Sequence, residues 1–297
     1  MRNALLSLFC FASILSFGQG VSLDSKYDKI ESETYTYKTV EDQELEFDFY
    51  KAKKAKGKLP LVVFVHGGGF VSGKRNDWQA TNFAKKLSER GYAVALVSYR
   101  LTMKDVGFGC EVTAEDKKGA INNASLDVTN AISKILKENK FKIDPEKVIL
   151  VGSSAGAETV LNTAYMFDYQ SIIPDFKFAG VISMAGAMLD VNAITQENAI
   201  PTQLFHGTGD PLVPYHMAPH HYCGSKKPGY MMLYGAAPIA ERLKGLGTAY
   251  YNYVVMGAGH DWSYLPFKDC FTEMNDFLYN DVMKIEKVRQ TERIIRP

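Results

Sequence analysis

The sequence is short of cysteine, of net charge and of long hydrophobic runs, and each shortage excludes a class of protein. Lys and Arg total 34 against 33 Asp and Glu, so no global field attracts nucleic acid or an acidic surface. The four cysteines form no Cys-x-x-Cys pair, and the adjacent His220 and His221 near Cys223 point in different directions, which makes a poor chelate. We therefore predict no metal site and no nucleic-acid partner.

The N-terminus carries an apolar run from Ala4 to Phe17, shorter than the roughly 20 residues that span a bilayer. The run follows Arg2 and ends in small residues near Gly18, which is typical of a secretory signal peptide. An uncleaved interfacial anchor is the alternative. We expect residues 1–18 to be removed, and the mature chain to be secreted or periplasmic with no stable membrane anchor.

The remaining residues, 19–297, alternate between apolar β-branched stretches and amphipathic helical stretches, with no internal repeat. We expect strands near Glu33–Val40, Glu44–Tyr50, Leu61–Val65, Tyr92–Ser98, Val148, Phe178–Met184, Pro201–His206 and Tyr250–Met256, and helices over Asp77–Arg90, Glu115–Asn139, Ala157–Ala164, Ala237–Leu246 and Phe271–Gln290. This alternation predicts a single α/β domain with a mostly parallel sheet of about eight strands and helices on both faces.

The segment Gly152-Ser153-Ser154-Ala155-Gly156 reads Gly-x-Ser-x-Gly and stands where a buried strand gives way to a helix. A serine between two glycines at such a turn is typical of a nucleophile elbow. Glycine is needed at both places because a side chain would collide as the backbone folds tightly over itself. The turn presents Ser154 at a helix N-terminus, where the dipole favours a developing anion. We predict that Ser154 is a nucleophile.

A serine nucleophile needs a base and an orienting acid, and the chain offers both past later strand ends. Asp210 follows one short apolar strand and His260 follows another. Strand ends at one edge of a parallel sheet would bring Ser154, Asp210 and His260 together. Asp261 could also orient His260, but Asp210 fits the order of strand ends better, and we interpret His206 as structural.

A glycine-rich loop, His66-Gly67-Gly68-Gly69-Phe70, follows the apolar strand Leu61–Val65. Glycine lets the backbone approach a substrate carbonyl and present its N–H groups. This pattern is typical of an oxyanion-hole loop. We predict that the N–H groups of Gly68, Gly69 and Ala155 bind the oxyanion.

Three aromatic residues, Phe70, Tyr215 and Trp262, are expected to contact the substrate. Tyr215 opens the segment Tyr215–Tyr234, which has little periodicity and is expected to cover part of the site as a small cap. Trp262 could equally pack in the core. Glu158, one helical turn beyond Ser154, is expected to cap or pair on its own helix in preference to contacting the substrate.

The motifs His66–Phe70, Gly152–Gly156, Gly207–Asp210 and Gly259–His260 together resemble those of the α/β-hydrolase superfamily, in its HGGG-type carboxylesterase and lipase-like branch. The resemblance covers nearly all of the mature chain and implies the α/β-hydrolase fold, a Ser-His-Asp triad and no cofactor. It implies a secreted serine carboxylic-ester hydrolase whose substrate is a small-molecule or polysaccharide ester, with short acyl groups favoured. A serine peptidase of the same fold and an inactive hydrolase-fold binding protein are the alternatives.

Three cysteines remain after the expected cleavage: Cys110, Cys223 and Cys270. Export permits a disulfide, and three cysteines leave one over. We favour pairing of Cys110 with Cys223, because both fall in loops expected on the catalytic side of the sheet. The pairings with Cys270 stay open.

Overall fold

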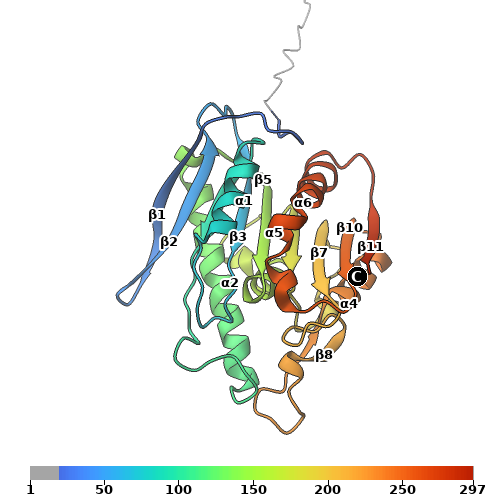
Figure 1. The fold of residues 1–297 in the computed structure, drawn as a ribbon. Coiled ribbons are helices and arrows are strands. Elements are labelled where there is room, and N and C mark those ends of the chain that lie inside the picture. The colour runs from blue at the N-terminus through green and yellow to red at the C-terminus, as the bar shows by residue number, and fades with distance from the viewer. Residues whose placement is uncertain (1–19, 297) are drawn as a thin grey trace, which may run out of the picture.

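A nine-stranded sheet runs through the residues that the computed structural model describes, 20–296, in the order β1-β2-β4-β3-β5-β6-β7-β10-β11 (Figure 1). β2 pairs antiparallel with β1 and with β4, and the other neighbours are parallel. The strands are β1 Ile30–Val40, β2 Gln43–Ala52, β3 Leu59–Val65, β4 Ala93–Val97, β5 Ile143–Ser153, β6 Gly180–Met184, β7 Thr202–Gly207, β10 Tyr250–Val255 and β11 Gln290–Ile295. The expected signal peptide, residues 1–18, lies outside the described residues.

Successive side chains of the central strands point to opposite faces of the sheet, and they pack in two separate hydrophobic cores. The helices are α1 Trp78–Ser88, α2 Ala114–Lys137, α3 Ala155–Tyr165, α4 Ala236–Gly245, α5 Pro266–Asp269 and α6 Phe271–Phe277. From β3, Leu61 and Val63 pack in the core that contains α2, α3 and α4, whereas Val62 and Phe64 pack with α1, α5 and α6. The prediction of helices on both faces is therefore confirmed. Within residues 20–296 no helix is long and apolar enough to cross a bilayer.

The C-terminal segment differs from the helix expected over Phe271–Gln290. α6 ends at Phe277, a π-helical stretch follows over Leu278–Lys284, and Gln290–Ile295 pairs in parallel with β10 as β11. No residue of this edge strand is fully buried, so the strand carries no alternating apolar pattern that would reveal it. The sheet therefore has nine strands where about eight were expected.

The segment Tyr215–Tyr234 forms a small cap at the edge toward which the parallel strands run, at the lower right of Figure 1. Two short strands, β8 (Met217–Pro219) and β9 (Met232–Tyr234), pair antiparallel at its base. A disulfide joins Cys223 of this segment to Cys110, which precedes α2, and Cys270 is buried and free. The favoured pairing is confirmed, and it ties the cap to the body of the domain.

Candidate active site

The turn between β5 and α3 is tight because glycines flank it on both sides. A Cβ on Gly152 would lie 2.2 Å from the carbonyl oxygen of Gly156, and one on Gly156 would lie 2.1 Å from that of Val65. Ser154 itself has φ 51° and ψ −122°, and its N–H donates to the Met184 carbonyl at 2.8 Å. A non-glycine residue in such a conformation costs about 1–3 kcal/mol and persists only where the surroundings hold it.

The helix that follows Ser154 supplies that support. Every residue of α3, from Ala155 to Tyr165, is buried, so the helix is packed on all sides between the sheet and α2. Its first N–H groups therefore keep a fixed position relative to the hydroxyl of Ser154. A positive helix end at this place favours negative charge beside the serine.

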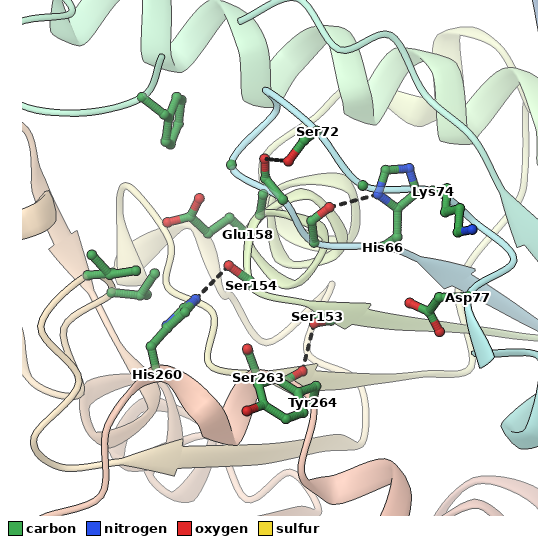
Figure 2. A pocket seen from close by; sticks show the side chains of 18 of the residues that line it. His66, Ser72, Lys74, Asp77, Ser153, Ser154, Glu158, His260, Ser263 and Tyr264 are labelled. Atoms are coloured by element: carbon green, nitrogen blue, oxygen red, sulfur yellow. Dashed lines mark hydrogen bonds between the residues drawn. The ribbon is translucent and has the colours of Figure 1, made fainter. Parts of the chain in front are cut away.

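Ser154, His260 and Asp210 form a continuous hydrogen-bonded chain across three loops at one edge of the sheet. Nε2 of His260 lies 2.7 Å from Oγ of Ser154, and Nδ1 of the same ring lies 2.7 Å from Oδ2 of Asp210. Figure 2 marks the contact between Ser154 and His260 with a dashed line. Because an ionised carboxylate only accepts hydrogen bonds, Nδ1 carries the ring proton. Nε2 is then free to accept the proton of the serine hydroxyl.

Asp210 is held ionised by the groups around it. Its side chain is buried, and Oδ1 accepts the N–H groups of Leu212 at 2.8 Å and Val213 at 3.0 Å. Burial raises the pKa of this carboxyl, but hydrogen bonds from His206 and His260 outweigh burial, so the pKa lies well below its ordinary value. Nε2 of His206 lies 3.5 Å from Oδ2 and 3.0 Å from the Val213 carbonyl, a supporting position.

The glycine-rich loop presents its backbone to the same place. A Cβ on Gly67 would lie 3.1 Å from the Cβ of Ser154, and a Cβ on Gly68, whose φ is +111°, would lie 2.1 Å from the Ser72 carbonyl oxygen. None of the hydrogen bonds among residues 20–296 uses the N–H of Gly68, Gly69 or Ala155 as a donor. These donors line the same cavity as Ser154 and are available to an oxygen bound there.

His66 supports this loop from behind. Its Nδ1 donates to the Gly67 carbonyl at 2.7 Å, and its ring stacks on Tyr99 with the ring centroids 4.4 Å apart. Tyr99 in turn donates its hydroxyl to the His66 carbonyl at 2.9 Å. Burial lowers the pKa of the His66 imidazole, so the ring stays neutral and acts as a fixed brace for the loop.

A cavity of about 640 Å³ opens over Ser154 and His260. The glycine-rich loop and Lys74 lie on one side of it, and Glu158 and His260 lie on the other (Figure 2). The cap contributes to the wall as well. The remaining lining residues are Ser72, Gly73, Asp77, Gln79, Phe108, Ser153, Ala155, Leu212, Val213, His220, His221, Ser263 and Tyr264.

The three aromatic residues expected at the substrate lie elsewhere. Phe70 is fully buried, with its ring centroid 4.8 Å from that of Phe108. Tyr215 is buried beside His206, and Trp262 stacks on Tyr253. Their large apolar surfaces are stabilised more by packing in the core than by lining an open cavity. Phe108 and Tyr264 are the aromatic residues that line it.

A buried polar cluster of Lys117, Glu158 and His220 lies beside the triad and has no counterpart in the sequence analysis. Glu158 does not pair on its own helix: its carboxyl faces the ring of His220, whose Nε2 lies 3.8 Å from Oε1 of Glu158. The spacing of four residues from Ser154 was a usable signal, because such residues share a helix face. Lys117 and His220 reach the cluster from distant segments of the chain, so no sequence spacing indicated that they would join it.

Within residues 20–296 no group of three or more His, Cys, Asp or Glu side chains is arranged to hold a metal ion.

Sequence comparison finds relatives among esterases and lipases. The BD-FAE family matches residues 47–194, which include the glycine-rich loop and the elbow but end before Asp210. Gut esterase 1 of Caenorhabditis elegans is 36% identical over 118 residues, which are 39% of this chain and 20% of that protein. Lipase 1 of Geotrichum candidum is 33% identical over 111 residues, 36% of this chain and 19% of that protein. The matches thus span about a fifth of the length of these curated relatives.

The structural comparison extends over most of the chain. Thermogutta terrifontis esterase 2, solved with propionate bound, superposes with a TM-score of 0.61 at 19% identity, covering 84% of this chain and 93% of that one. The same esterase has been solved bound to butyrate and phosphorylated by paraoxon. At this identity the likeness establishes a shared fold, the α/β-hydrolase fold.

Proposed function

We propose that this chain, which has the α/β-hydrolase fold, is a serine carboxylic-ester hydrolase of the carboxylesterase-like family and works through an acyl-enzyme. The observation that carries the proposal is the hydrogen-bonded triad that runs from Ser154 through His260 to Asp210, in which both hydrogen bonds are 2.7 Å long. The relatives named as esterases and lipases support the same class of reaction.

In the proposed mechanism, Oγ of Ser154 attacks the acyl carbon while Nε2 of His260 takes the hydroxyl proton. Asp210 keeps the ring in the required tautomer and stabilises its charged form. The N–H groups of Gly68, Gly69 and Ala155 stabilise the oxyanion of the tetrahedral intermediate. His260 then gives its proton to the leaving alcohol, and a water molecule repeats the sequence on the acyl-enzyme to release the acid.

We further propose that the substrates carry short acyl groups, either on small alcohols or on polysaccharides. The cap is a short segment over one side of a cavity of about 640 Å³. The propionate and butyrate bound to the structurally similar esterase support short acyl groups.

Secretion or export to the periplasm belongs to the same proposal. The leader pattern at residues 1–18 and the disulfide between Cys110 and Cys223 support it, because disulfides persist in oxidising compartments.

The test is a substrate panel measured on the wild type and on Ser154→Ala. We expect 4-nitrophenyl acetate and butyrate to be hydrolysed faster than the octanoate, with acetylated xylan and methyl ferulate distinguishing acetyl from feruloyl groups. Ser154→Ala is expected to lose at least about a thousand-fold in kcat. A folded wild type that hydrolyses no ester would overturn the proposal, and aminoacyl and dipeptidyl anilides would then test the peptidase alternative.

A further inference from the structure

The cluster of Lys117, Glu158 and His220 lies in the wall of the cavity and takes no part in the acyl transfer described above. All three side chains are at least 98% buried. Glu158 and His220 line the cavity with Ser154, and Lys117 lies directly behind them. Charged and polar side chains are rarely buried to this degree without a partner or a ligand.

The hydrogen bonds of Lys117 determine which ring nitrogen of His220 carries the proton. Nζ of Lys117 lies 3.3 Å from Nδ1 of His220 and 3.2 Å from the Gly229 carbonyl. An ammonium group only donates hydrogen bonds, so Nδ1 of His220 accepts and Nε2 carries the proton. Burial lowers the pKa of His220 to about 2, which keeps the ring neutral with this single N–H.

The carboxyl of Glu158 lies near this nitrogen but beyond hydrogen-bond distance. Nε2 of His220 and Oε1 of Glu158 are 3.8 Å apart, beyond the 2.7–3.2 Å of a protein hydrogen bond. Oε1 has no hydrogen-bond partner, and leaving a buried polar atom unpaired costs about 1–3 kcal/mol. Figure 2 shows the Glu158 carboxyl on the same side of Ser154 as the His260 ring.

We propose that Glu158 and His220 form a hydroxyl-binding subsite that selects esters with a free hydroxyl near the scissile bond, as in esters of sugars and polyols. A hydroxyl oxygen placed between the two residues would accept the N–H of His220 and donate to Oε1 of Glu158. Two atoms 3.8 Å apart can each lie about 2.8 Å from one such oxygen. This inference rests on the proposed ester hydrolysis and specifies its substrate.

The charges around Glu158 favour a hydroxyl over a cation. Lys117, Asp210, Tyr99 and the neutral ring of His220 are the titratable groups that face it, and burial raises the pKa of Glu158 to about 8. A hydroxyl group both donates and accepts, so it fits a neutral carboxyl as well as an ionised one. An ammonium ligand would need the ionised form and would add a second positive charge close to Lys117.

The test compares two acetate esters with the same carbon skeleton, glycerol monoacetate and propyl acetate. The readout is the ratio of their kcat/KM values, which removes effects common to both substrates. We expect the wild type to favour glycerol monoacetate by at least about ten-fold, because the subsite is left unpaired by propyl acetate. Glu158→Leu and His220→Phe should each lower that ratio about ten-fold or more, and Glu158→Gln should retain part of it.

Each other outcome has a distinct meaning. A wild-type ratio near one, or a ratio that Glu158→Leu leaves unchanged, overturns the proposed subsite. In either case, turnover of 4-nitrophenyl acetate would still support the proposed ester hydrolysis. A preference for acetylcholine over 3,3-dimethylbutyl acetate would identify Glu158 as a cation site and also overturn it. If the wild type hydrolyses no ester, including 4-nitrophenyl acetate, the proposed function fails and the subsite fails with it.

Discussion

Oδ2 of Asp210 accepts the Nδ1 proton of His260 at 2.7 Å, although the two residues are 50 positions apart in the chain. They meet because β7 and β10 are parallel neighbours, with Gly207 opposite Val255 in register. The loops after the two strands then pack against each other, and a Cβ on Gly207 would lie 2.3 Å from the Ala258 carbonyl oxygen. The acid and the base are thus positioned by the pairing of the strands that carry them.

Asp210→Asn is expected to lower kcat about ten-thousand-fold, because an amide favours the wrong tautomer of His260 and does not stabilise the charged ring. Steady-state hydrolysis of 4-nitrophenyl acetate measures this. Asp261→Asn is the matched control, because Asp261 neighbours His260 in sequence but is exposed and does not belong to the hydrogen-bonded triad. Equal losses in the two variants would contradict the assignment of Asp210.

Two substitutions in the glycine-rich loop test whether the position of the backbone N–H donors matters for catalysis. A Cβ on Gly68 would lie 2.1 Å from the Ser72 carbonyl oxygen, whereas a Cβ on Gly69 meets nothing closer than 3.8 Å. Gly68→Ala must displace the loop, and we expect kcat to fall at least about a hundred-fold as an oxyanion donor moves. Gly69→Ala should lose less. Similar kcat values for both variants, each shown to be folded, would count against this arrangement of donors.

The stability of the protein should depend on pH through Glu158. Burial raises the pKa of its carboxyl from 4.5 to about 8, so the folded state keeps a proton that the unfolded chain releases above about pH 4.5. Wild-type stability from this group is therefore complete below pH 4.5 and is lost as the pH rises toward 8. Relative to the wild type, Glu158→Gln gains up to about 1.4 kcal/mol per pH unit across this window.

Urea unfolding of both proteins at pH 5 and pH 8 measures that difference. Four other titratable groups lie near Glu158, and they are present in both proteins, so their contributions largely cancel in the comparison. These groups are Lys117, Asp210, His220 and Tyr99. A difference in the free energy of unfolding that stays constant with pH, or that shrinks as the pH rises, would show that the carboxyl titrates in its ordinary range.

The disulfide between Cys110 and Cys223 closes a loop across 113 positions of the chain. Replacing both cysteines by serine should lower the free energy of unfolding by about 2–5 kcal/mol, because the unfolded chain regains entropy. The matched control is Glu111→Gln, which removes the exposed ion pair with Lys227 that links the same two segments. That change should lower the free energy of unfolding by under about 1 kcal/mol. An equal loss for both changes would argue against the disulfide as the main link between the two segments.

Features with a strong local pattern could be predicted from the sequence. The apolar β3 strand, the glycines of the elbow and the order of Ser154, Asp210 and His260 all depend on short-range sequence. Each functional residue follows the end of a buried strand by a few positions. The structure brings these three side chains together at the expected edge of the sheet.

Features that depend on packing between distant segments could not be predicted. β11 has no fully buried residue, so nothing in its sequence distinguishes it from a solvated loop. Phe70 looks like a lining residue because it adjoins the glycine-rich loop, yet it is fully buried. The contact of Lys117 with His220 arises only when the cap docks on α2, and no spacing in the chain encodes it.

The most direct test of the central claim is covalent labelling by paraoxon followed by peptide mapping. One phosphoryl group is expected to attach to Ser154, esterase activity is expected to fall in proportion, and Ser154→Ala is expected to take up no label. Ser153 is the built-in control, because its hydroxyl is buried and donates to the Ser263 carbonyl at 2.6 Å. Label on Ser153 or on any residue other than Ser154, or full activity in the labelled protein, would contradict the account.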